Sequence, residues 1–161
     1  MRIGIGYDIH QLKRGRPLVL GGVTIPFEKG LLGHSDADVL VHAVCDALLG
    51  AAGLGDIGLH FPDTDPELKD IYSIRLLAKT YEMVSSKGFA ISNVDSTIFA
   101  EAPELSPYRE EMQKNIAQAI QIEPNRVNVK ATTSERLGII GKGEGIAAMC
   151  IVLLRGTGKR K

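Results

Sequence analysis

An almost uninterrupted apolar segment near the C-terminus, residues 145–154, constrains the fold more than any other feature of this chain. It is apolar at nearly every position, which favours a buried β-strand. Side chains alternate between the two faces of a sheet, so a strand with one face in water is polar at every second position. Both faces of this strand should therefore be covered. One layer of helices covers a single face, and we expect the other face to pack against further copies of the chain.

Strand and helix signals alternate along the rest of the sequence. Strands are expected over residues 2–9, 17–20, 23–25, 89–100, 126–131 and 145–154, with a Gly21-Gly22 hairpin turn. Helices are expected over residues 35–52, 71–86 and 106–120, with Ser35 and Ser106 as N-caps. Residues 29–33, 53–65 and 132–144 have the composition of loops. These patterns predict a single-domain α/β (α+β) fold in which helices cover one face of a mixed sheet of about four strands.

Length and charge exclude several classes of protein. The 161 residues are most simply one domain, which we place at 1–156, followed by a basic tail over 157–161 that we expect to be disordered. Lys and Arg together number 19, as do Asp and Glu. The chain therefore lacks the excess of basic residues that would indicate a nucleic-acid partner. We expect no membrane association and a cytoplasmic location, because neither a signal-peptide pattern nor a spanning apolar run is present.

Cys45 and Cys150 lie in apolar stretches and are predicted to be core residues.

Three of the four histidines lie within the first 42 residues, close to an aspartate. Asp8 and His10 are two positions apart on a predicted strand, so they should project side by side. His42 should lie about two turns into the following helix and approach from a third direction. Two imidazoles and one carboxylate suit zinc, and three protein ligands leave a fourth position open for chemistry. We predict a metal site at these three residues; the alternative is a capping aspartate with two partly buried histidines.

The predicted start of the first helix is a candidate anion site. His34 and Ser35 stand where unpaired N–H groups and the helix dipole favour a phosphate, although an N-cap beside a surface histidine explains the same pattern. Asp38, His42 and Asp46 recur every four residues, away from the apolar stripe of this helix. Either aspartate is a candidate to hydrogen-bond a metal-bound imidazole. The alternative for both is a solvated helix charge.

Two loops carry further candidate groups. Residues 56–65 place several carboxylates among turn residues, which suits the hydroxyls of a sugar or polyol. Residues 131–135 follow a predicted strand and offer three hydroxyls and a carboxylate for phosphate contacts and a second, harder cation. A solvated turn and a helix-capping run are the alternatives. The glycines over 138–145 do not complete a phosphate loop, Gly4-x-Gly6 does not complete a dinucleotide fingerprint, and we find no nucleophilic cysteine or serine motif.

Taken in order, six segments closely resemble the 2-C-methyl-D-erythritol 2,4-cyclodiphosphate synthase family of the non-mevalonate isoprenoid pathway. The segments are GIGYDIH (4–10), LGGVTIPFEKGLLGHSDADVLVHAVCDALLGAAGLGDIG (20–58), FPDTDP (61–66), NVDSTIFAEAP (93–103), VNVKATTSERLG (127–138) and GKGEGIA (141–147). The resemblance implies a metal-dependent phosphorus–oxygen lyase. Its substrate would be 4-diphosphocytidyl-2-C-methyl-D-erythritol 2-phosphate, and its products the cyclic diphosphate and CMP.

The same resemblance implies an assembly and two metal ions. The assembly is a homotrimer with active sites between neighbouring subunits, so the free face of the sheet would pack around a threefold axis. Zinc would be held by Asp8, His10 and His42. Magnesium or manganese would bridge phosphates near Glu135.

The resemblance also assigns roles to individual residues. His34 and Thr133 would stabilise the transition state, and Asp56 and Asp63 would hold the methylerythritol hydroxyls. The full set of implied substrate contacts is Asp8, His10, His34, Ser35, Asp56, Ile57, Gly58, Phe61, Pro62, Asp63, Thr64, Asp65, Ala100, Glu101, Ala102, Pro103, Glu104, Leu105, Ser106, Ala131, Thr132, Thr133, Ser134, Glu135, Ile139 and Lys142.

The sequence departs from the family pattern at three positions. Glu104 occupies a position that is often Lys, which leaves only backbone contacts to the nucleotide there. Ile139 and Lys142 stand where Phe and Arg commonly line a cavity on the threefold axis, which in relatives is thought to accept an isoprenoid diphosphate. Two other functions fit the metal ligands: a zinc phosphoester hydrolase with His34 as base, and a metal-stabilised nucleotide-binding module.

Overall fold

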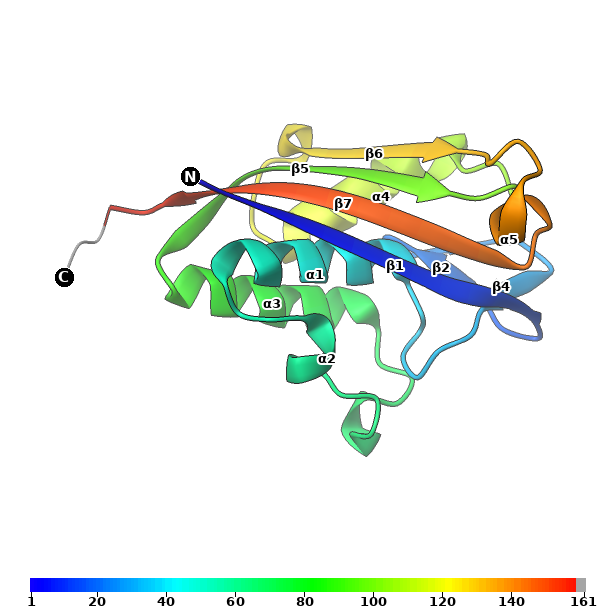
Figure 1. Cartoon of the computed structure of the whole chain (residues 1–161), viewed down its shortest axis with the longest axis horizontal. Coiled ribbons are helices and arrows are strands. Elements are labelled where there is room, and N and C mark those ends of the chain that lie inside the picture. The colour runs from blue at the N-terminus through cyan, green and yellow to red at the C-terminus, as the bar shows by residue number, and fades with distance from the viewer. Residues whose placement is uncertain (159–161) are drawn as a thin grey trace.

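The apolar C-terminal segment forms the central strand of a five-stranded mixed sheet (Figure 1). The strand order is β4-β1-β7-β5-β6, in which β5 and β6 are parallel and the other neighbours antiparallel. The strands are β1 (Arg2–Arg14), β4 (Lys29–Leu31), β5 (Phe89–Phe99), β6 (Val127–Thr132) and β7 (Gly145–Gly156). This computed structural model describes residues 1–158. It confirms the predicted fold class, with one strand more than expected.

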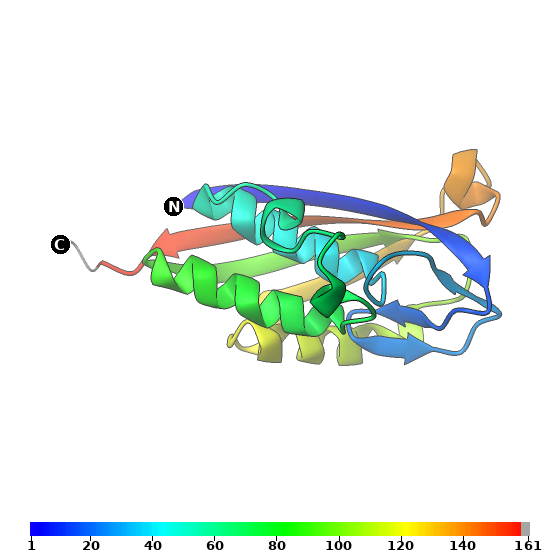
Figure 2. The ribbon, with the colours of Figure 1, turned by 90° about the horizontal axis from the view of Figure 1, so that it is seen from below.

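The three long helices cover one face of the sheet and leave the other free (Figure 2). The helices are α1 (Val39–Ala52), α2 (Ile57–His60), α3 (Ser73–Ser86), α4 (Arg109–Ala119) and α5 (Gly138–Gly141), with 3₁₀ turns η1 (Pro66–Leu68), η2 (Ser106–Tyr108) and η3 (Pro124–Arg126). α1 packs directly on β1: a Cβ on Gly4 would lie 1.9 Å from the carbonyl oxygen of Ala47, and one on Gly6 would lie 2.0 Å from that of Ala43. Gly4 and Gly6 therefore allow the backbone of α1 to pack closely against β1.

A buried aspartate joins the predicted hairpin to the first helix. The hairpin strands are β2 (Leu18–Leu20) and β3 (Val23–Ile25). Gly21 and Gly22 form their turn with φ of 59° and 72°, which glycine adopts without strain. Their N–H groups donate to the carboxylate of Asp38 at 3.0 and 2.8 Å, and the N–H of Val41 donates to it at 3.0 Å. Asp38 is thus the N-cap of α1, and the prediction of Ser35 was wrong.

Burial dominates the electrostatics of that aspartate. It raises the pKa of the Asp38 carboxyl to about 6, with the charge of Asp36 adding to the effect and the three backbone N–H donors opposing it. Asp38 is fully buried, so the prediction that it and its row face away from the core was wrong for this residue.

Several other boundaries differ from the prediction. β1 continues to Arg14 because it pairs there with β4, which lies where a loop was expected. The predicted loops contain α2 and α5, and Ser106 opens a 3₁₀ turn without capping it. Elements of three or four residues carry too little periodic signal to be recognised from sequence. The long strands β5 and β7, the helix α3 and the hairpin follow the prediction closely.

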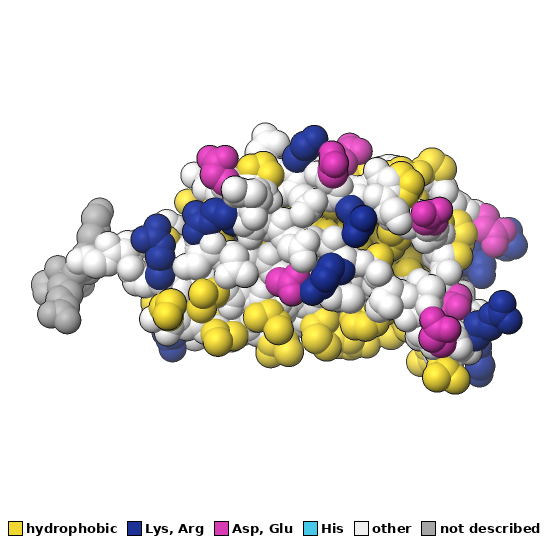
Figure 3. Space-filling view, turned by 90° about the horizontal axis from the view of Figure 1, so that it is seen from above, with side chains coloured by type: hydrophobic (Ala, Val, Ile, Leu, Met, Phe, Trp, Pro, Cys, Tyr) yellow, Lys and Arg dark blue, Asp and Glu magenta, His cyan; other side chains and the backbone are white. Residues whose placement is uncertain are grey.

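The free face of the sheet is apolar along β1 and β7. On β7, the side chains that face the helices are buried, whereas Met149 and Ile151 on the other face are exposed. The exposed apolar side chains of the two strands are 36–73% accessible; they are Ile3, Ile5, Tyr7, Ile9, Met149 and Ile151. In Figure 3 hydrophobic side chains form a row along the lower edge of the molecule, where this face is seen in profile. We call these six residues the apolar strip.

The remaining sequence expectations concern the cysteines and the C-terminus. Cys45 and Cys150 are buried free thiols in the core, as predicted. Thr157 is hydrogen-bonded, since its N–H donates to the carbonyl of Gly88 at 2.9 Å. The rest of the basic tail, residues 159–161, lies outside the described residues. Within residues 1–158, every helix is too short or too polar to cross a membrane.

Candidate active site

Asp8, His10 and His42 converge as predicted. Asp8 and His10 are neighbours on the helix-facing side of β1, and the packing of α1 on β1 brings His42 against them. Oδ2 of Asp8 lies 3.0 Å from Nε2 of His10 and 3.0 Å from Nδ1 of His42. One ligand atom from each residue lies within 4.8 Å of the other two. His42 lies in the first turn of α1, because the helix begins at Val39 and not at residue 35.

The second nitrogen of each imidazole determines its orientation. Nδ1 of His10 lies 2.7 Å from the carbonyl oxygen of Leu32, which can only accept, so Nδ1 donates and the Nε2 lone pair faces Asp8. Nε2 of His42 lies 2.9 Å from Oγ of Ser73 and 3.2 Å from Oγ of Ser35, which leaves Nδ1 for the aspartate side. A lone pair and a carboxylate oxygen at 3.0 Å require a proton or a cation between them.

The electrostatics of the cluster follow from the same contacts. Burial alone would raise the pKa of the Asp8 carboxyl, but the hydrogen bonds and charges of His10 and His42 hold it well below its usual range. Burial would lower the pKa of His10, and the hydrogen bond and charge of Asp8 raise it instead.

The donor set fits a divalent metal ion. Zinc bonds of about 2.0–2.1 Å place tetrahedral ligands roughly 3.3 Å apart, close to the separations from Asp8 to the two imidazoles. One carboxylate and two imidazoles leave a fourth position open.

The cluster forms one wall of a cavity of about 330 Å³. The cavity is lined by Asp8, His10, Leu32, Gly33, His34, Ser35, His42, Ile57, Phe61, Asp63, Leu68, Ile71 and Leu76. We call it the metal cavity. It unites residues of the predicted metal site, the 34–35 pair and the 56–65 loop. Leu68, Ile71 and Leu76 were missed, because apolar wall residues resemble core residues in the sequence.

The carboxylates of the 56–65 loop have different roles. Asp63 lines the metal cavity, whereas Asp56 accepts from the N–H of Leu59 at 2.9 Å and caps α2. Asp65 accepts from the N–H of Glu67 at 2.9 Å and caps η1. Gly58, Pro62 and Thr64 lie in the same loop outside the cavity lining. The loop therefore presents one of its carboxylates to the cavity.

Two expectations about the surroundings of the metal site were wrong. Asp38 is bound to backbone N–H groups, and Asp46 accepts from the N–H of Ile57 at 2.7 Å, so neither orients an imidazole. His34 and Ser35 precede the true helix start and are not at its free N–H groups. Nε2 of His34 instead lies 3.0 Å from the carbonyl oxygen of Asp65, which ties it to the cavity wall.

A second cavity, also of about 330 Å³, lies at the C-terminal ends of the parallel strands β5 and β6. It is lined by Ala100, Glu101, Ala102, Pro103, Glu104, Leu105, Ser106, Ala131, Thr132 and Thr133. These are the segments predicted to contact the nucleotide, so we call it the nucleotide cavity. It shares no lining residue with the metal cavity.

The end of the 131–135 segment is tied to its surroundings. The hydroxyl of Thr133 donates to Oε1 of Glu135 at 3.1 Å, and the N–H of Ser134 donates to Glu101 at 3.3 Å. Glu135 and Arg136 have φ of 54° and 63°, a left-handed backbone that non-glycine residues adopt rarely.

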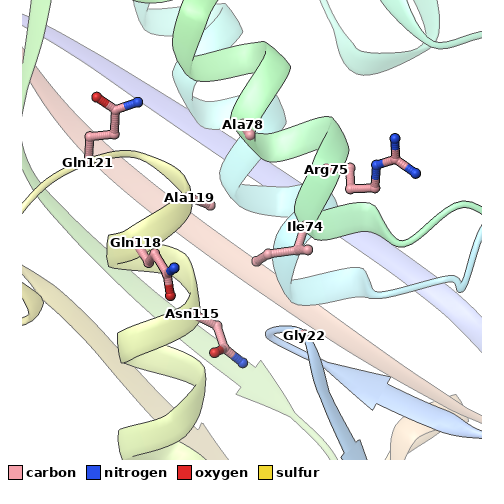
Figure 4. A pocket seen from close by; sticks show the side chains of 8 residues that line it. All are labelled: Gly22, Ile74, Arg75, Ala78, Asn115, Gln118, Ala119 and Gln121. Atoms are coloured by element: carbon pink, nitrogen blue, oxygen red, sulfur yellow. The ribbon is translucent and has the colours of Figure 1, made fainter.

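Two further hollows lie elsewhere. One of about 520 Å³ contains Ile139 beside Ile9 and Gly145, and Lys142 is not part of its lining. The other, of about 490 Å³, is a groove between α3 and α4 (Figure 4). Its lining of Gly22, Ile74, Arg75, Ala78, Asn115, Gln118, Ala119 and Gln121 has no carboxylate, imidazole or thiol. The metal cavity, although smaller than both, brings one aspartate and two imidazoles together and is therefore the best candidate for chemistry.

Comparison with known proteins identifies the family. The model of the YgbB family matches residues 1–155. The chain belongs to the YgbB family. The resemblance seen in the sequence is thereby confirmed.

Named members of the YgbB family are similar along their whole length. The 2-C-methyl-D-erythritol 2,4-cyclodiphosphate synthase of Desulfatibacillum aliphaticivorans is 64% identical, over 96% of this chain and 99% of that protein. The enzyme of the same name from Bacillus subtilis (strain 168) is 57% identical, over 96% and 98%.

Solved structures agree with this assignment. A 2C-methyl-D-erythritol-2,4-cyclodiphosphate synthase in a CDP-bound form has a TM-score of 0.88 at 38% identity, covering 96% of this chain and 100% of that one. The bifunctional IspDF of Campylobacter jejuni has a TM-score of 0.93 at 46% identity; it covers 96% of this chain, which spans 42% of that longer protein.

Proposed function

We propose that this chain converts 4-diphosphocytidyl-2-C-methyl-D-erythritol 2-phosphate to 2-C-methyl-D-erythritol 2,4-cyclodiphosphate and CMP, in the non-mevalonate isoprenoid pathway. The observation that carries the proposal is the convergence of Asp8, His10 and His42 in one cavity, in a chain 64% identical to a synthase of that name.

The reaction is an intramolecular phosphoryl transfer. An oxygen of the 2-phosphate attacks the β-phosphorus, the bond from that phosphorus to the bridging oxygen breaks, and CMP leaves with the electron pair. The substrate supplies the nucleophile, so the protein needs none. This agrees with the thiols: burial raises the pKa of Cys45 to about 12 and raises that of Cys150 as well, so both are unreactive.

The protein's task is positioning and charge neutralisation. Asp8, His10 and His42 would hold zinc, and Glu135 a magnesium or manganese ion. Bound there, the two ions would supply Lewis-acid stabilisation of charge on the phosphate oxygens. His34 and Thr133 would hydrogen-bond the reacting phosphates, and their places beside the two cavities support these roles.

The remaining contacts are proposed for the two ends of the substrate. Asp63, on the wall of the metal cavity, would hold the methylerythritol hydroxyls, with Asp56 and the loop 56–65 around it. The backbone of 100–106 and 131–135 would hold cytidine and its phosphates, as the CDP-bound form of a relative suggests.

The active assembly is proposed to be a trimer with the apolar strip at its centre. Exposed apolar surface of this extent on two adjacent strands favours burial against another copy. The two cavities are separated along the sheet: β7 lies between β1 and β5, so at least two strand spacings, roughly 10 Å, divide them. A site made from the metal cavity of one subunit and the nucleotide cavity of the next would unite them.

Three further proposals complete this account. The hollow beside Ile139 would lie near the threefold axis, where an isoprenoid diphosphate would meet Lys142 as a point charge. The domain comprises residues 1–156, and the enzyme acts in the cytoplasm. The first of these rests on the resemblance and on the position of Ile139, and the other two rest on the resemblance and the sequence patterns alone.

Phosphorus NMR tests the proposed reaction. Incubation of the zinc-loaded protein with the substrate and magnesium should give resonances of a cyclic diphosphate and of CMP. In water enriched in ¹⁸O, the cyclic product should carry no label. A labelled phosphomonoester as the product would show hydrolysis and contradict the proposal.

A further inference from the structure

A chain of three hydrogen-bonded side chains, His42, Ser73 and Asp36, begins at the metal cavity. Ser73 is the first residue of α3 and is fully buried, with its Oγ 2.9 Å from Nε2 of His42. The same Oγ donates to Oδ1 of Asp36, and the N–H of Ser73 donates to Oδ2 of Asp36 at 3.0 Å. Both carboxylate oxygens of Asp36 are therefore bound to one serine.

The chemistry of these groups determines the direction of each hydrogen bond. A carboxylate only accepts, so the single hydroxyl proton of Ser73 goes to Asp36. The serine oxygen then can only accept from His42, and Nε2 of His42 must carry a proton. Oγ of Ser35, which accepts from the N–H of Ala37 at 3.1 Å, is a second neighbour of Nε2 of His42 at 3.2 Å.

We propose that Asp36 and Ser73 position His42 for the metal ion, by holding its proton on Nε2 and its Nδ1 lone pair toward Asp8. Ser73 is a positioning residue: it touches the ligand and not the substrate. This inference rests on the proposed metal centre at Asp8, His10 and His42. A partner on the far nitrogen fixes the tautomer of a ligating imidazole and strengthens it as a donor.

The two histidines achieve this result by different means. His10 uses a backbone carbonyl, that of Leu32, as the acceptor for its far nitrogen. His42 uses a serine hydroxyl that is itself oriented by a carboxylate. The support of His42 can therefore be removed by substitution, whereas that of His10 cannot.

The serine also links the metal ligand to the substrate loop. The segment 34–36 is hydrogen-bonded to the residues between that loop and α3. The N–H of Asp70 donates to the carbonyl of His34 at 2.9 Å, and the N–H of Asp36 donates to that of Ile71 at 3.1 Å. Ser73 begins α3 two residues after Ile71. The hydrogen bonds of segment 34–36 and Ser73 thus hold both the His42 imidazole and the chain that follows the loop carrying Asp63.

The test is the zinc affinity of matched variants, measured by competition with a chromophoric chelator. Ser73→Ala should raise the dissociation constant about 10–100-fold, the usual effect of removing the partner of a ligating histidine. Asp36→Asn should weaken zinc binding as well, because an amide that donates to Ser73 turns the serine proton toward Nε2 and moves the histidine proton to Nδ1. The control is Thr80→Val, which removes another fully buried hydroxyl from α3; its zinc affinity should stay within about twofold.

Cobalt-substituted protein gives a second measurement that a structural defect alone would not produce. The visible absorption band of cobalt at this site should shift or weaken in Ser73→Ala and Asp36→Asn and remain unchanged in Thr80→Val. Unchanged affinity and spectrum in both test variants would overturn the inference, as would an equal loss in the control. If the wild-type protein bound no zinc, the proposed metal centre itself would be wrong, and this inference with it.

Discussion

The two cavities differ in how firmly their polar groups are held. In the metal cavity the imidazoles of His10 and His42 are each held at both nitrogens, and Asp8 lies 3.0 Å from both of these rings. In the nucleotide cavity Thr132, Thr133 and Glu104 are exposed, and the lining comes from residues 100–106 and from the end of β6. The first cavity therefore holds its aspartate and these two imidazoles in fixed orientations. The second has most of its polar side chains in solvent, Glu104 among them, so their positions are less constrained.

The largest effect is expected in the metal cavity. His42→Ala or Asp8→Ala should reduce turnover by about 10³-fold or more, because Lewis-acid stabilisation contributes several kcal/mol. Zinc content should fall in parallel. Circular dichroism should show a folded protein, since neither side chain belongs to the apolar core. Full activity in a zinc-free His42→Ala protein would contradict the metal assignment.

The next largest losses of activity are expected for two residues beside the nucleotide cavity, Thr133 and Glu135, which should respond differently to added metal. Thr133→Val should cost ~10²–10³-fold in rate, because it removes a donor to the reacting phosphates. Glu135→Gln should be rescued in part by raised magnesium or manganese, since mass action refills a weakened metal site. Added metal should not rescue Thr133→Val. Equal rescue of both variants would show that the two roles are wrongly assigned.

Zinc binding should depend on pH in a direction set by His10. Its pKa is raised beside Asp8, so below that pKa zinc must displace a proton from His10. The pKa of Asp8 is lowered, so this carboxylate stays ionised through the same range. Zinc affinity should therefore fall about tenfold per pH unit on acidification below the His10 pKa and level off above it. Affinity that rises on acidification would contradict the donor set.

The smallest effect is expected at the rim of the nucleotide cavity. Glu104→Ala should change KM by less than about twofold, because its side chain is exposed and carries no assigned contact. A steady-state comparison with wild type measures this. A large increase in KM would show that Glu104 takes part in nucleotide binding after all.

The metal ligands could be predicted from the sequence, whereas the residue that positions one of them could not. Asp8, His10 and His42 could be found because metal ligands are few in type and their spacing on a strand is regular. The role of Ser73 could not, because it depends on contacts with Asp36 and His42, more than 30 residues away.

Long-range contacts also explain the errors in the fold. Ser35 and Asp38 are equally good N-caps by residue type, and the choice between them is made by Gly21 and Gly22 of a distant hairpin. β4 exists only because the end of β1 pairs with it. Periodicity located the elements with many residues, whereas tertiary pairing determined the short ones.

The central claim is that one active site takes its metal cavity from one subunit and its nucleotide cavity from the next. Co-expression of His42→Ala with Thr133→Val tests it, because each variant retains the cavity that the other lacks. In randomly mixed trimers roughly a quarter of the sites would pair two intact cavities. Co-expression of His42→Ala with Asp8→Ala, which damage the same cavity, is the control and should give no recovery.

The measurement is the specific activity of the purified mixed assembly, with its mass checked against three times 17.4 kDa. We expect roughly a quarter of the wild-type activity from the first pair, far above either variant alone. Activity no higher than the mean of the two variants would show that each chain builds its own complete site, and would contradict the shared site.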